Sequence, residues 1–374
     1  MRILVLIHEF PPIGGGGGAA ARDICFGLAK RGHDVKVLTA HFGDLPKRET
    51  IQGVDVIRLA SWRREAFRAR MPEMAAYVLA SLTAGTSLAR RFHPDVIHAH
   101  FAVPAGASAW TLSRLTRIPY VLTAHLGDVP GGVPEKTGKW FRYIQPFTQP
   151  IWRGAKRVVA VSQFTRGLAL QNYNIPIDVI PNGVDVASLR PRNIEINNPP
   201  RLVFAGRFME QKNPLQIVRV LSRLRNLAWT CSFLGDGPLL EPTRREIESF
   251  GLTDRFHLPG WVTPENVLTE FKRSDILFMP SRSEGLPVVG VQALACGLAL
   301  VVGRVGGFID LVNGNGSLHD PDDTDGQVSA LSSLLSSPAA LLSARQKSLE
   351  LAQTFDIEHV VDEYEGIFRS VIKR

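Results

Sequence analysis

The sequence predicts an α/β protein made of two Rossmann-like, doubly wound domains. Its 374 residues exceed the size at which one hydrophobic core usually stops growing, so two domains are expected. Short apolar runs alternate with amphipathic helical patterns, as expected for parallel strands that are covered on both faces by crossover helices. The same alternation opens a second time near residue 200. Two such domains facing each other leave a cleft between them, and ligands commonly bind in clefts of this kind.

The first round begins with the apolar run 2–10, which we interpret as a buried strand. An amphipathic helical pattern follows over 21–30 and ends at Gly32, since glycine is a common helix terminator. Further strands are expected over 34–40, 95–101 and 120–126. A strand, a serine and a helix over 158–170 close this round.

The second round follows a linker over 187–200 that is rich in proline and asparagine and has no hydrophobic period. A strand is expected over 201–208, and a helix from Pro214 to about Asn226. Later strands are expected over 231–237, 255–262, 276–281 and 299–305, with helices from residue 323 to the end. We therefore expect domains over 1–185 and 186–355, with a last helix over 356–374 that packs back on the first domain.

The composition predicts a soluble protein of the cytoplasm. Apolar residues make up 45% of the chain and charged residues 21%, and no segment has the roughly 20 apolar residues of a spanning helix. The opening apolar run breaks at His8 and Glu9 and lacks a small-residue cleavage site, so a strand is favoured over a signal peptide. Cys25, Cys231 and Cys296 are isolated in apolar surroundings, which indicates core residues in a reducing compartment.

The positive charge is concentrated in the first half. Residues 1–190 contain 24 lysines and arginines against 13 aspartates and glutamates. The densest cluster contains Arg63, Arg64, Arg68 and Arg70, interleaved with Trp62, Phe67 and Met71. One interpretation is an interfacial segment that binds an anionic membrane surface, and the protein would then lie on the inner face of the cell membrane. The other is a solvated basic helix or loop. No motif for nucleic-acid binding accompanies the charge, so nucleic acid is not an expected partner.

A phosphate site is expected at the start of the second domain. Arg207 follows a predicted strand end, and Lys212 directly precedes Asn213 and Pro214. Asparagine and proline in this order favour an N-cap and a first helical residue. Two cations and a helix N-terminus would then hold a diphosphate by charge-assisted hydrogen bonds, without a metal ion.

A second polar cluster is expected in the run 281–297. Glu284 precedes the turn Gly285, Leu286 and Pro287, and an apolar helix is expected from Pro287 to Cys296. Gln292 lies five residues beyond Pro287, about 7 Å further along the helix axis. A long polar ligand could contact both Glu284 and Gln292.

The glycine run after the first strand does not fit a known nucleotide motif well. Gly14, Gly16 and Ala19 match a dinucleotide fingerprint, but the second strand does not end in the acidic residue that a ribose needs. A Walker A lysine is also missing. We expect instead a backbone-exposing loop in which Gly15, Gly16 and Gly17 line the cleft.

The histidines have different expected roles. His98 and His100 alternate on one strand without neighbouring carboxylates or cysteines, so a structural role is favoured over a metal site. His125 stands at the carboxyl end of a predicted strand, the edge at which α/β proteins bind ligands, and Asp128 follows three residues later. A role in the cleft is therefore predicted for His125.

These motifs, in this order and spacing over residues 2–322, resemble the retaining glycosyltransferases of the two-domain GT-B fold, in the large family numbered 4, also called group 1. The run from Glu284 to Gln292 is similar to the family's Glu-x7-Glu signature, with glutamine in place of the second glutamate. The resemblance implies transfer of a hexose-type sugar from a UDP or GDP sugar to a hydroxyl group, with retention at the anomeric carbon. It suits the assembly of a polysaccharide or a glycolipid, with a carbohydrate or lipid-linked acceptor, and requires no cofactor or metal ion.

The resemblance also implies roles for individual residues. Arg207 and Lys212 would stabilise the departing diphosphate, Glu284 and the turn Gly285–Pro287 would hold the sugar hydroxyls, and His125 would contact the sugar near the reacting carbon. Gln292 would bind the ribose. The remaining positions implied are the donor-side glycines Gly15, Gly16 and Gly17, the base and ribose contacts near Gly235 and Val262, and the acceptor-side Asp128.

Three alternative functions remain open on the sequence. The first is a sugar-nucleotide epimerase of the same architecture, which would need no acceptor. The second is a nicotinamide oxidoreductase, disfavoured by the missing ribose-binding acid. The third is a degenerate nucleotide-sugar-binding protein without catalysis, for which Gln292 would be the explanation. The presence of Arg207, Lys212 and Glu284 argues against the third.

Overall fold

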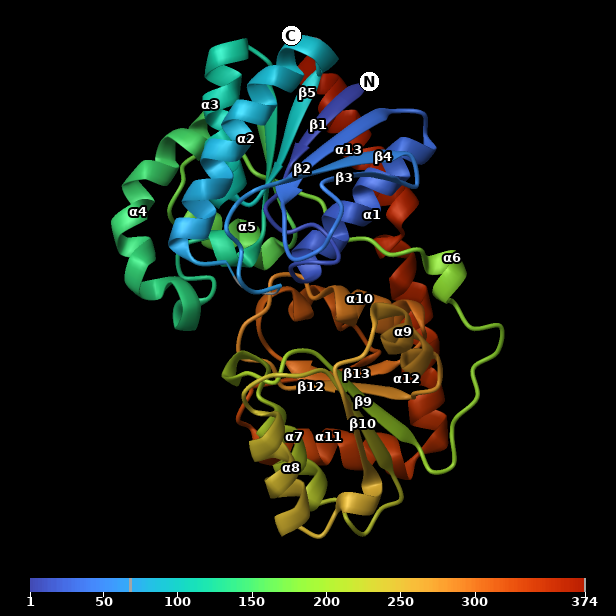
Figure 1. The fold of residues 1–374 in the computed structure, drawn as a ribbon. Helices are drawn as coiled ribbons and strands as arrows, with labels where there is room; N and C mark the ends of the chain where they lie inside the picture. Colours follow the sequence, from blue (N-terminus) through green and yellow to red (C-terminus); the bar gives the residue numbers. More distant parts are fainter. Residues whose placement is uncertain (67–68, 373–374) are drawn as a thin grey trace. The chain divides into compact units, whose positions relative to one another are not determined.

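The chain forms two compact units, each with a mainly parallel sheet between helices (Figure 1). The computed structural model describes residues 1–66 and 69–372, with the side chains of all of these except 134–143. One unit contains Met1–Gly183 and Ile357–Arg374, and the other contains Val184–Asp356. The predicted α/β class with two Rossmann-like domains is confirmed.

The first unit is built on a sheet of eight strands in the order β3-β4-β2-β1-β5-β6-β7-β8. Its strands are β1 (Arg2–Leu6), β2 (Asp34–Ala40), β3 (Arg48–Ile51), β4 (Val54–Leu59), β5 (Val96–His100), β6 (Tyr120–Ala124), β7 (Arg157–Ala160) and β8 (Asp178–Val179). Its helices are α1 (Gly16–Lys30), α2 (Met71–Phe92), α3 (Ala107–Thr116), α4 (Pro134–Gly154), α5 (Gln163–Leu170) and α13 (Ile357–Ile372). All neighbouring strands pair in parallel except β3, which is antiparallel to β4.

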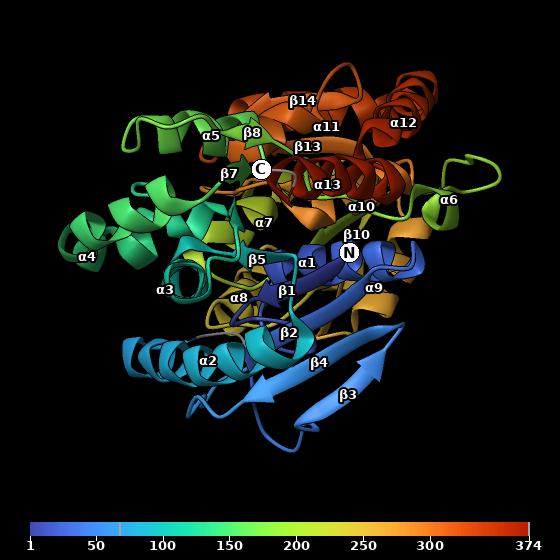
Figure 2. The ribbon, with the colours of Figure 1, turned by 90° about the horizontal axis from the view of Figure 1, so that it is seen from above.

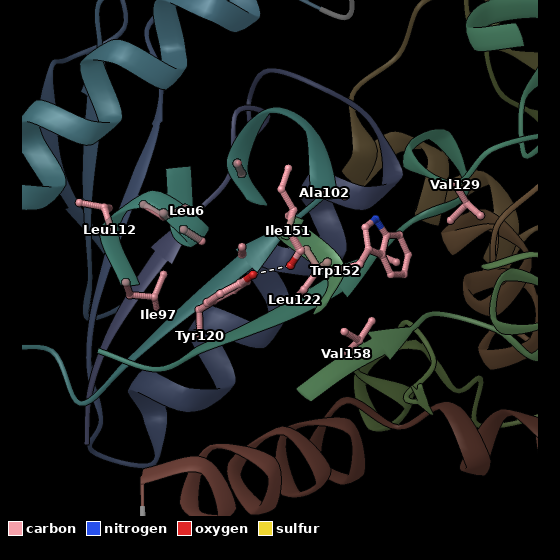
Figure 3. Close-up of a cluster of buried hydrophobic side chains, with 14 of the residues drawn as sticks. Leu6, Ile97, Ala102, Leu112, Tyr120, Leu122, Val129, Ile151, Trp152 and Val158 are labelled. Atoms are coloured by element: carbon pink, nitrogen blue, oxygen red, sulfur yellow. Dashed lines mark hydrogen bonds between the residues drawn. The ribbon is translucent and has the colours of Figure 1, made fainter. Parts of the chain in front are cut away.

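Alternate residues of each strand in this sheet pack into two separate cores. On β1, Leu4 and Leu6 face the side covered by α2, α3 and α4, where Tyr120 and Trp152 are also buried (Figure 3). Ile3 and Val5 face the opposite side, which is covered by α1 and α13 (Figure 2). This division follows from the twofold side-chain period of a strand, and it explains why the strand sequences are apolar without alternation.

The C-terminal helix α13 belongs to the first unit and packs on α1. A Cβ at Gly27 of α1 would lie 2.5 Å from Val361 Cγ2, so glycine allows the two helices to approach closely. Arg31 at the end of α1 donates to the carboxylate and the carbonyl of Glu358. Tyr364 and Phe368 are buried between α13 and the sheet.

The second unit is built on a sheet of six parallel strands in the order β11-β10-β9-β12-β13-β14. Its strands are β9 (Arg201–Ala205), β10 (Thr230–Leu234), β11 (Phe256–Gly260), β12 (Ile276–Met279), β13 (Ala299–Gly303) and β14 (Gly316–His319). Its helices are α6 (Val186–Leu189), α7 (Pro214–Ser222), α8 (Leu240–Ser249), α9 (Pro264–Lys272), α10 (Val288–Ala295), α11 (Thr324–Ser336) and α12 (Pro338–Ala352). In Figure 1, α7, α8 and α11 cover one face of this sheet, and α9, α10 and α12 cover the other.

The segment predicted as a linker over 187–200 is attached to the second unit by hydrogen bonds. The side-chain amide of Asn197 donates to the Asp275 carboxylate and to the Arg273 carbonyl. Asp275 is buried and also pairs with Arg345 of α12, whose guanidinium donates to the Glu195 carbonyl. The polar residues of this segment therefore satisfy buried groups of the second unit.

Several element predictions were wrong in their bounds. The helix predicted from Pro214 to about Asn226 ends at Ser222, and α1 begins at Gly16, earlier than its apolar period suggested. The hairpin of β3 and β4 was not predicted, because its first strand is polar and half exposed. Its two-residue turn, Gln52 at φ 48° and Gly53 at φ 80°, has the positive φ angles that such turns require.

Candidate active site

The second unit brings Lys212 and Glu284 into direct contact. Lys212 Nζ lies 2.5 Å from Glu284 Oε1, and both side chains are largely buried, at 16% and 7% exposed. Lys212 ends a 3₁₀ turn (Glu210–Lys212) that follows β9, and Glu284 lies in the loop after β12. Because β9 and β12 are parallel neighbours, their carboxyl-terminal loops meet at the same edge of the sheet.

The two loops that carry this pair are tied together by further hydrogen bonds. Gln211 Nε2 donates to the Ser283 carbonyl at 2.9 Å, and the Arg282 amide donates to the Gln211 carbonyl at 2.8 Å. Arg282 also makes a bidentate contact with Asp322, with both N–O distances at 2.6 Å. Hydrogen bonds from Arg282 lower the pKa of the Asp322 carboxyl below its usual value. The loops after β9 and β12 are therefore held by each other, and the second is also held by Asp322.

Asn213 does not act as the predicted side-chain N-cap. It stands at the N-cap of α7 in the left-handed conformation, with φ 52°, and makes no side-chain cap hydrogen bond. Its amide nitrogen instead donates to the Pro321 carbonyl at 3.1 Å. Pro214 occupies the first turn of α7, as predicted. The first amides of α7 are thus not capped by the Asn213 side chain.

The turn after Glu284 depends on two glycines that were not predicted to belong to the site. A Cβ at Gly306, whose φ is 54°, would lie 1.6 Å from the Glu284 carbonyl oxygen. A Cβ at Gly307 would lie 2.2 Å from the Gly285 carbonyl oxygen, and its amide donates to that oxygen at 2.6 Å. The Gly-Gly pair after β13 was the available sequence signal, because adjacent glycines often mark a close backbone approach.

Helix α10 begins one residue later than predicted. Pro287 is its N-cap, with an extended ψ of 116°, and the helix runs over Val288–Ala295. Gly297 follows at φ 71°, which agrees with the predicted helix end. Gln292 lies on α10 and is half-buried. Leu286 in the preceding turn is buried.

The other predicted positions of this unit also lie at the carboxyl ends of its strands. Gly235 follows β10 at φ 139°, and a Cβ there would lie 2.0 Å from the Gly206 carbonyl oxygen after β9. Arg207 follows Gly206 and is exposed. Val262 lies in the loop between β11 and α9 and is half-buried. Glycine is required at 235 by both the backbone conformation and the close contact.

In the first unit, His125 lies at the carboxyl end of β6 and contacts two aromatic neighbours. His125 Nε2 lies 3.3 Å from His100 Nδ1, and the ring of Phe101 is 4.3 Å from the His125 ring, centroid to centroid. His125 is buried, and burial lowers its pKa to about 3, so its imidazole is neutral at physiological pH. Phe101 and His100 were not predicted to support this position.

The glycine run places one residue directly against His125. Gly15 is the N-cap of α1, and Gly16 and Gly17 form its first turn. A Cβ at Gly17 would lie 2.7 Å from Phe101 Cζ and 3.2 Å from His125 Nδ1, whereas a Cβ at Gly15 would meet no atom within 4 Å. The run therefore contains a position that requires glycine and one that does not.

Asp128 lies below the surface near His125 and supports the backbone after β5. Its Oδ2 accepts from the Ala102 amide at 2.6 Å, and its amide donates to the His125 carbonyl at 3.3 Å. Burial raises the pKa of Asp128 to about 7. Its other oxygen is buried without a hydrogen-bond partner in the described structure. The acceptor-side role of Asp128 remains a prediction.

Comparison with protein-family models covers both units. Residues 14–188 match the model described as Glycosyltransferase Family 4, and residues 186–350 match the model described as Glycosyl transferases group 1. The chain belongs to the GT-B glycosyltransferases of group 1. It is therefore an enzyme that transfers sugars.

Similarity in sequence and in fold to individual proteins supports this family assignment. This glycosyltransferase is 27% identical to the 2-deoxystreptamine glucosyltransferase of Streptomyces kanamyceticus, over 89% of this chain and 93% of that protein. Its fold is similar to sucrose-phosphate synthase from Thermosynechococcus elongatus, with a TM-score of 0.85 at 18% identity, covering 100% and 99% of the two chains. It is also similar to Anabaena HepE in complex with UDP-glucose, with a TM-score of 0.78 at 18% identity, covering 99% and 100%.

The side chain of His98 in this glycosyltransferase is engaged by its neighbours in the core of the first unit. His98 Nε2 lies 2.8 Å from Thr123 Oγ1, and its ring packs on Tyr364 and Phe368 of α13. Among the side chains that the structure describes, which leave out 67–68, 134–143 and 373–374, no group of histidine, cysteine and acidic residues is arranged to hold a metal ion. The three cysteines are buried and unpaired.

The predicted membrane-facing arginines do not form one exposed cluster. Both interpretations of the cluster, a membrane-facing segment and a solvated basic segment, expected an exposed Arg63, but its side chain is only 1% exposed and it donates to the carbonyls of His8 and Ala66. Its buried charge is compensated by these backbone oxygens and by the carboxylate of Glu9, which lies 3.3 Å from Arg63 Nη2. Arg64 is exposed, Arg70 pairs with Glu65, and Arg68 lies outside the described residues.

None of the helices that the structure describes has the length and apolar character needed to cross a bilayer.

Proposed function

We propose that this glycosyltransferase moves a hexose-type sugar from a nucleoside-diphosphate sugar to a hydroxyl acceptor, with retention at the anomeric carbon. The contact between Lys212 and Glu284 is the observation that carries the proposal. Lys212 is a cation that would bind phosphate, Glu284 is a carboxylate that would bind sugar hydroxyls, and both lie at one sheet edge next to the N-terminus of α7. The assembly of a polysaccharide or glycolipid would use such a reaction.

The Lys212–Glu284 pair can bind a donor without losing its own contact. An ammonium group has three donors, so two remain for phosphate oxygens while one contacts Glu284. A carboxylate offers about four acceptor positions, which leaves several for hydroxyl groups. Arg207 on the same loop would add a second cation. Neutralising the departing diphosphate in this way lowers the barrier by electrostatic stabilisation, with no metal ion required.

The remaining donor contacts follow from the same placement. The turn Gly285–Pro287 would bind the sugar, Gln292 the ribose, and the backbone near Gly235 and Val262 the base. Gln292 has one carbonyl acceptor where a glutamate would have a charged pair of oxygens, which weakens ribose binding by about 1 kcal/mol. The difference affects affinity for the donor rather than the chemical step.

In the first unit, His125 would contact the transferred sugar, and Gly15, Gly16 and Gly17 would lie on the donor side. A neutral imidazole can donate one hydrogen bond to a sugar oxygen without placing a second charge in the site. The departing phosphate would accept the proton of the acceptor hydroxyl, so no nucleophilic side chain is needed. Positioning and leaving-group stabilisation then account for catalysis.

The names of similar proteins guide the choice of donor. HepE has been crystallised with UDP-glucose, and the Streptomyces kanamyceticus relative is named a glucosyltransferase. UDP-glucose is therefore the first donor to test, with GDP-mannose second.

Donor binding and turnover test the function together. Thermal shifts with UDP, GDP, ADP and NAD should show stabilisation by one nucleoside diphosphate and none by NAD. Incubation with the matching nucleotide sugar, without acceptor, should release the nucleoside diphosphate slowly, and Lys212→Ala should abolish release. Lys347→Ala, which removes an exposed pair with Glu350, is the matched control. Conversion to an epimerised sugar would indicate the epimerase alternative, and stabilisation by NAD alone would indicate an oxidoreductase.

We propose that the acceptor is presented at an anionic membrane surface on the cytoplasmic side. Arg64 is exposed near Trp62, which is 75% exposed. Met71 and Leu79 on α2 are also exposed. Cations beside exposed apolar side chains suit the interface of an anionic bilayer. Flotation with phosphatidylglycerol vesicles at low salt should recover the protein, and Arg64→Glu should reduce recovery more than Arg166→Glu on α5. No recovery with wild type would contradict membrane binding.

A further inference from the structure

Three buried histidines form a spatial row in the first unit, from His98 in the core through His100 to His125 in the candidate site. His98 and His100 alternate on β5 and therefore point to the same face of the sheet. His125 follows β6, the parallel neighbour of β5, and its Nε2 lies 3.3 Å from His100 Nδ1. The proposed function uses His125 only, so His98 and His100 need a separate explanation.

His98 holds His100 in position by packing rather than by a hydrogen bond. The two rings lie 4.1 Å apart, centroid to centroid. His98 is itself held by Thr123 Oγ1 at 2.8 Å, and that hydroxyl lies 3.0 Å from the Tyr364 hydroxyl on α13. His100 is completely buried, so its ring has little freedom to rotate away from His125.

The contact between His100 and His125 joins two neutral rings. Burial lowers the pKa of His100 well below its usual value and that of His125 to about 3. Each neutral imidazole carries one N–H, so one of the two facing nitrogens donates and the other accepts. The tautomer of one ring therefore fixes the tautomer of the other.

The other nitrogen of His100 decides which ring donates. His100 Nε2 is buried and has no hydrogen-bond partner in the described structure. A buried N–H without a partner is rarer and more costly than a buried acceptor without one. The N–H of His100 therefore belongs on Nδ1, where it has an acceptor in His125 Nε2.

We infer that His100 is a positioning residue that donates to His125 Nε2 and fixes His125 in the Nδ1–H tautomer. The His125 Nδ1 faces the first turn of α1, because a Cβ at Gly17 would lie 3.2 Å from it. An N–H at this position is a hydrogen-bond donor for an oxygen of the transferred sugar. The role of that donor rests on the proposed function, whereas the tautomer itself does not.

The tautomer is measured directly by long-range 1H–15N correlation spectra of protein labelled with 15N-histidine. The signals of His125 are identified by their loss in His125→Asn. Wild type should show His125 with a protonated Nδ1 and with Nε2 as a hydrogen-bonded acceptor. In His100→Phe, which fills the same space without a donor, the 15N signal of His125 Nε2 should move downfield, as expected for an acceptor that has lost its hydrogen bond. A protonated Nε2 in wild type, or an unchanged Nε2 signal in His100→Phe, would overturn the inference.

Activity provides a second test that a purely structural role would not satisfy. His100→Phe should lower kcat about tenfold while KM for the donor changes less than about twofold, as expected for the loss of one oriented hydrogen bond. His100→Asn should recover most of kcat, because its amide nitrogen lies close to the position of Nδ1 and can donate to His125. Equal loss in both variants, with an unchanged melting temperature, would contradict the positioning role.

The two tests separate this inference from the proposed function. If wild type turns over no nucleotide sugar, the proposed function fails, and the spectra still decide the tautomer. If His100→Phe does not fold, the spectra of wild type and His100→Asn decide it. Wild type with the Nδ1–H tautomer and His100→Asn retaining it would support the inference.

Discussion

Lys212 Nζ and Glu284 Oε1 lie 2.5 Å apart, although 72 residues separate them in the sequence. Their contact results from the parallel pairing of β9 with β12, which brings the two carboxyl-terminal loops to one edge of the sheet. The pair is largely buried, and the removal of either member leaves an uncompensated charge.

Lys212→Ala and Glu284→Gln should each lower kcat by at least about 10²-fold, because under the proposed function each removes a group that would stabilise charge or bind the sugar in the transition state. Lys212→Ala should also lower the melting temperature, since it leaves the Glu284 carboxylate buried and unpaired. Kinetics with the identified donor and thermal unfolding measure both effects. Lys347→Ala should leave both unchanged, and an active Lys212→Ala enzyme would contradict the assignment.

Gly17→Ala should lower the activity and the free energy of unfolding, whereas Gly15→Ala should leave the free energy of unfolding nearly unchanged. The added Cβ at Gly17 would lie 2.7 Å from Phe101 Cζ and displace the ring that packs on His125. Overpacking of this kind costs about 1 to 3 kcal/mol. At Gly15 the same atom meets nothing within 4 Å. Denaturant unfolding and donor turnover of the two variants provide the comparison, and equal behaviour would show that the contact has no importance.

Gln292→Glu should leave donor binding unchanged or tighten it up to about tenfold. If residue 292 binds the ribose as proposed, the added charge would strengthen its hydrogen bonds to the ribose hydroxyls by about 1 kcal/mol, and every 1.4 kcal/mol corresponds to a factor of ten. Isothermal titration with the nucleoside diphosphate measures the change. A tenfold or greater loss of affinity in a folded variant would show that Gln292 does not contact the ribose.

The free energy of unfolding should fall as the pH falls below 6.5. Burial lowers the pKa of His8 to about 4 and those of His98 and His125 to about 3, and it also depresses that of His100. Between these values and 6.5 the unfolded chain binds protons that the folded chain does not. Each such proton lowers stability by about 1.4 kcal/mol per pH unit. Denaturant unfolding from pH 8 to 5 measures the slope, and a flat profile would contradict the buried neutral histidines.

Asp128 should affect the pH dependence of the free energy of unfolding in the direction opposite to that of the buried histidines. Its pKa is raised from 3.8 to about 7, so its contribution is complete below pH 3.8 and is lost as the pH rises through 7. Asp128→Asn keeps an acceptor for the Ala102 amide and has no charge to bury. As the pH rises from 5 to 8, the free energy of unfolding of Asp128→Asn should therefore increase relative to that of wild type. A constant difference over this range would indicate that Asp128 is ionised throughout.

The fold was predictable because the buried strands are distinctive in the sequence. The runs at β1, β6, β9 and β12 are short, apolar and bounded by polar or glycine residues, as parallel strands between helices require. The hairpin of β3 and β4 was missed because β3 is half exposed and polar, and its stability comes from pairing with β4 rather than from its own composition.

The candidate site was predictable only in part. Lys212 and Glu284 were identified because each has the right chemistry after a predicted strand, but their contact depends on strand order, which the sequence does not specify. His100 and Phe101 were missed because their contacts with His125 depend on the pairing of β5 with β6. The environment of Arg63 could not be predicted, because the carbonyl groups that surround it come from separate segments.

The configuration of the sugar first released from the donor tests the central proposal most directly. Proton NMR of UDP-α-glucose, or of the donor identified in the binding panel, follows the anomeric signal during hydrolysis, at an enzyme concentration high enough for hydrolysis to outpace mutarotation of the released sugar. A retaining enzyme with Lys212 and Glu284 in the donor site should release the α-anomer first, and Lys212→Ala should release none. First appearance of the β-anomer, or equal release by wild type and Lys212→Ala, would contradict the account.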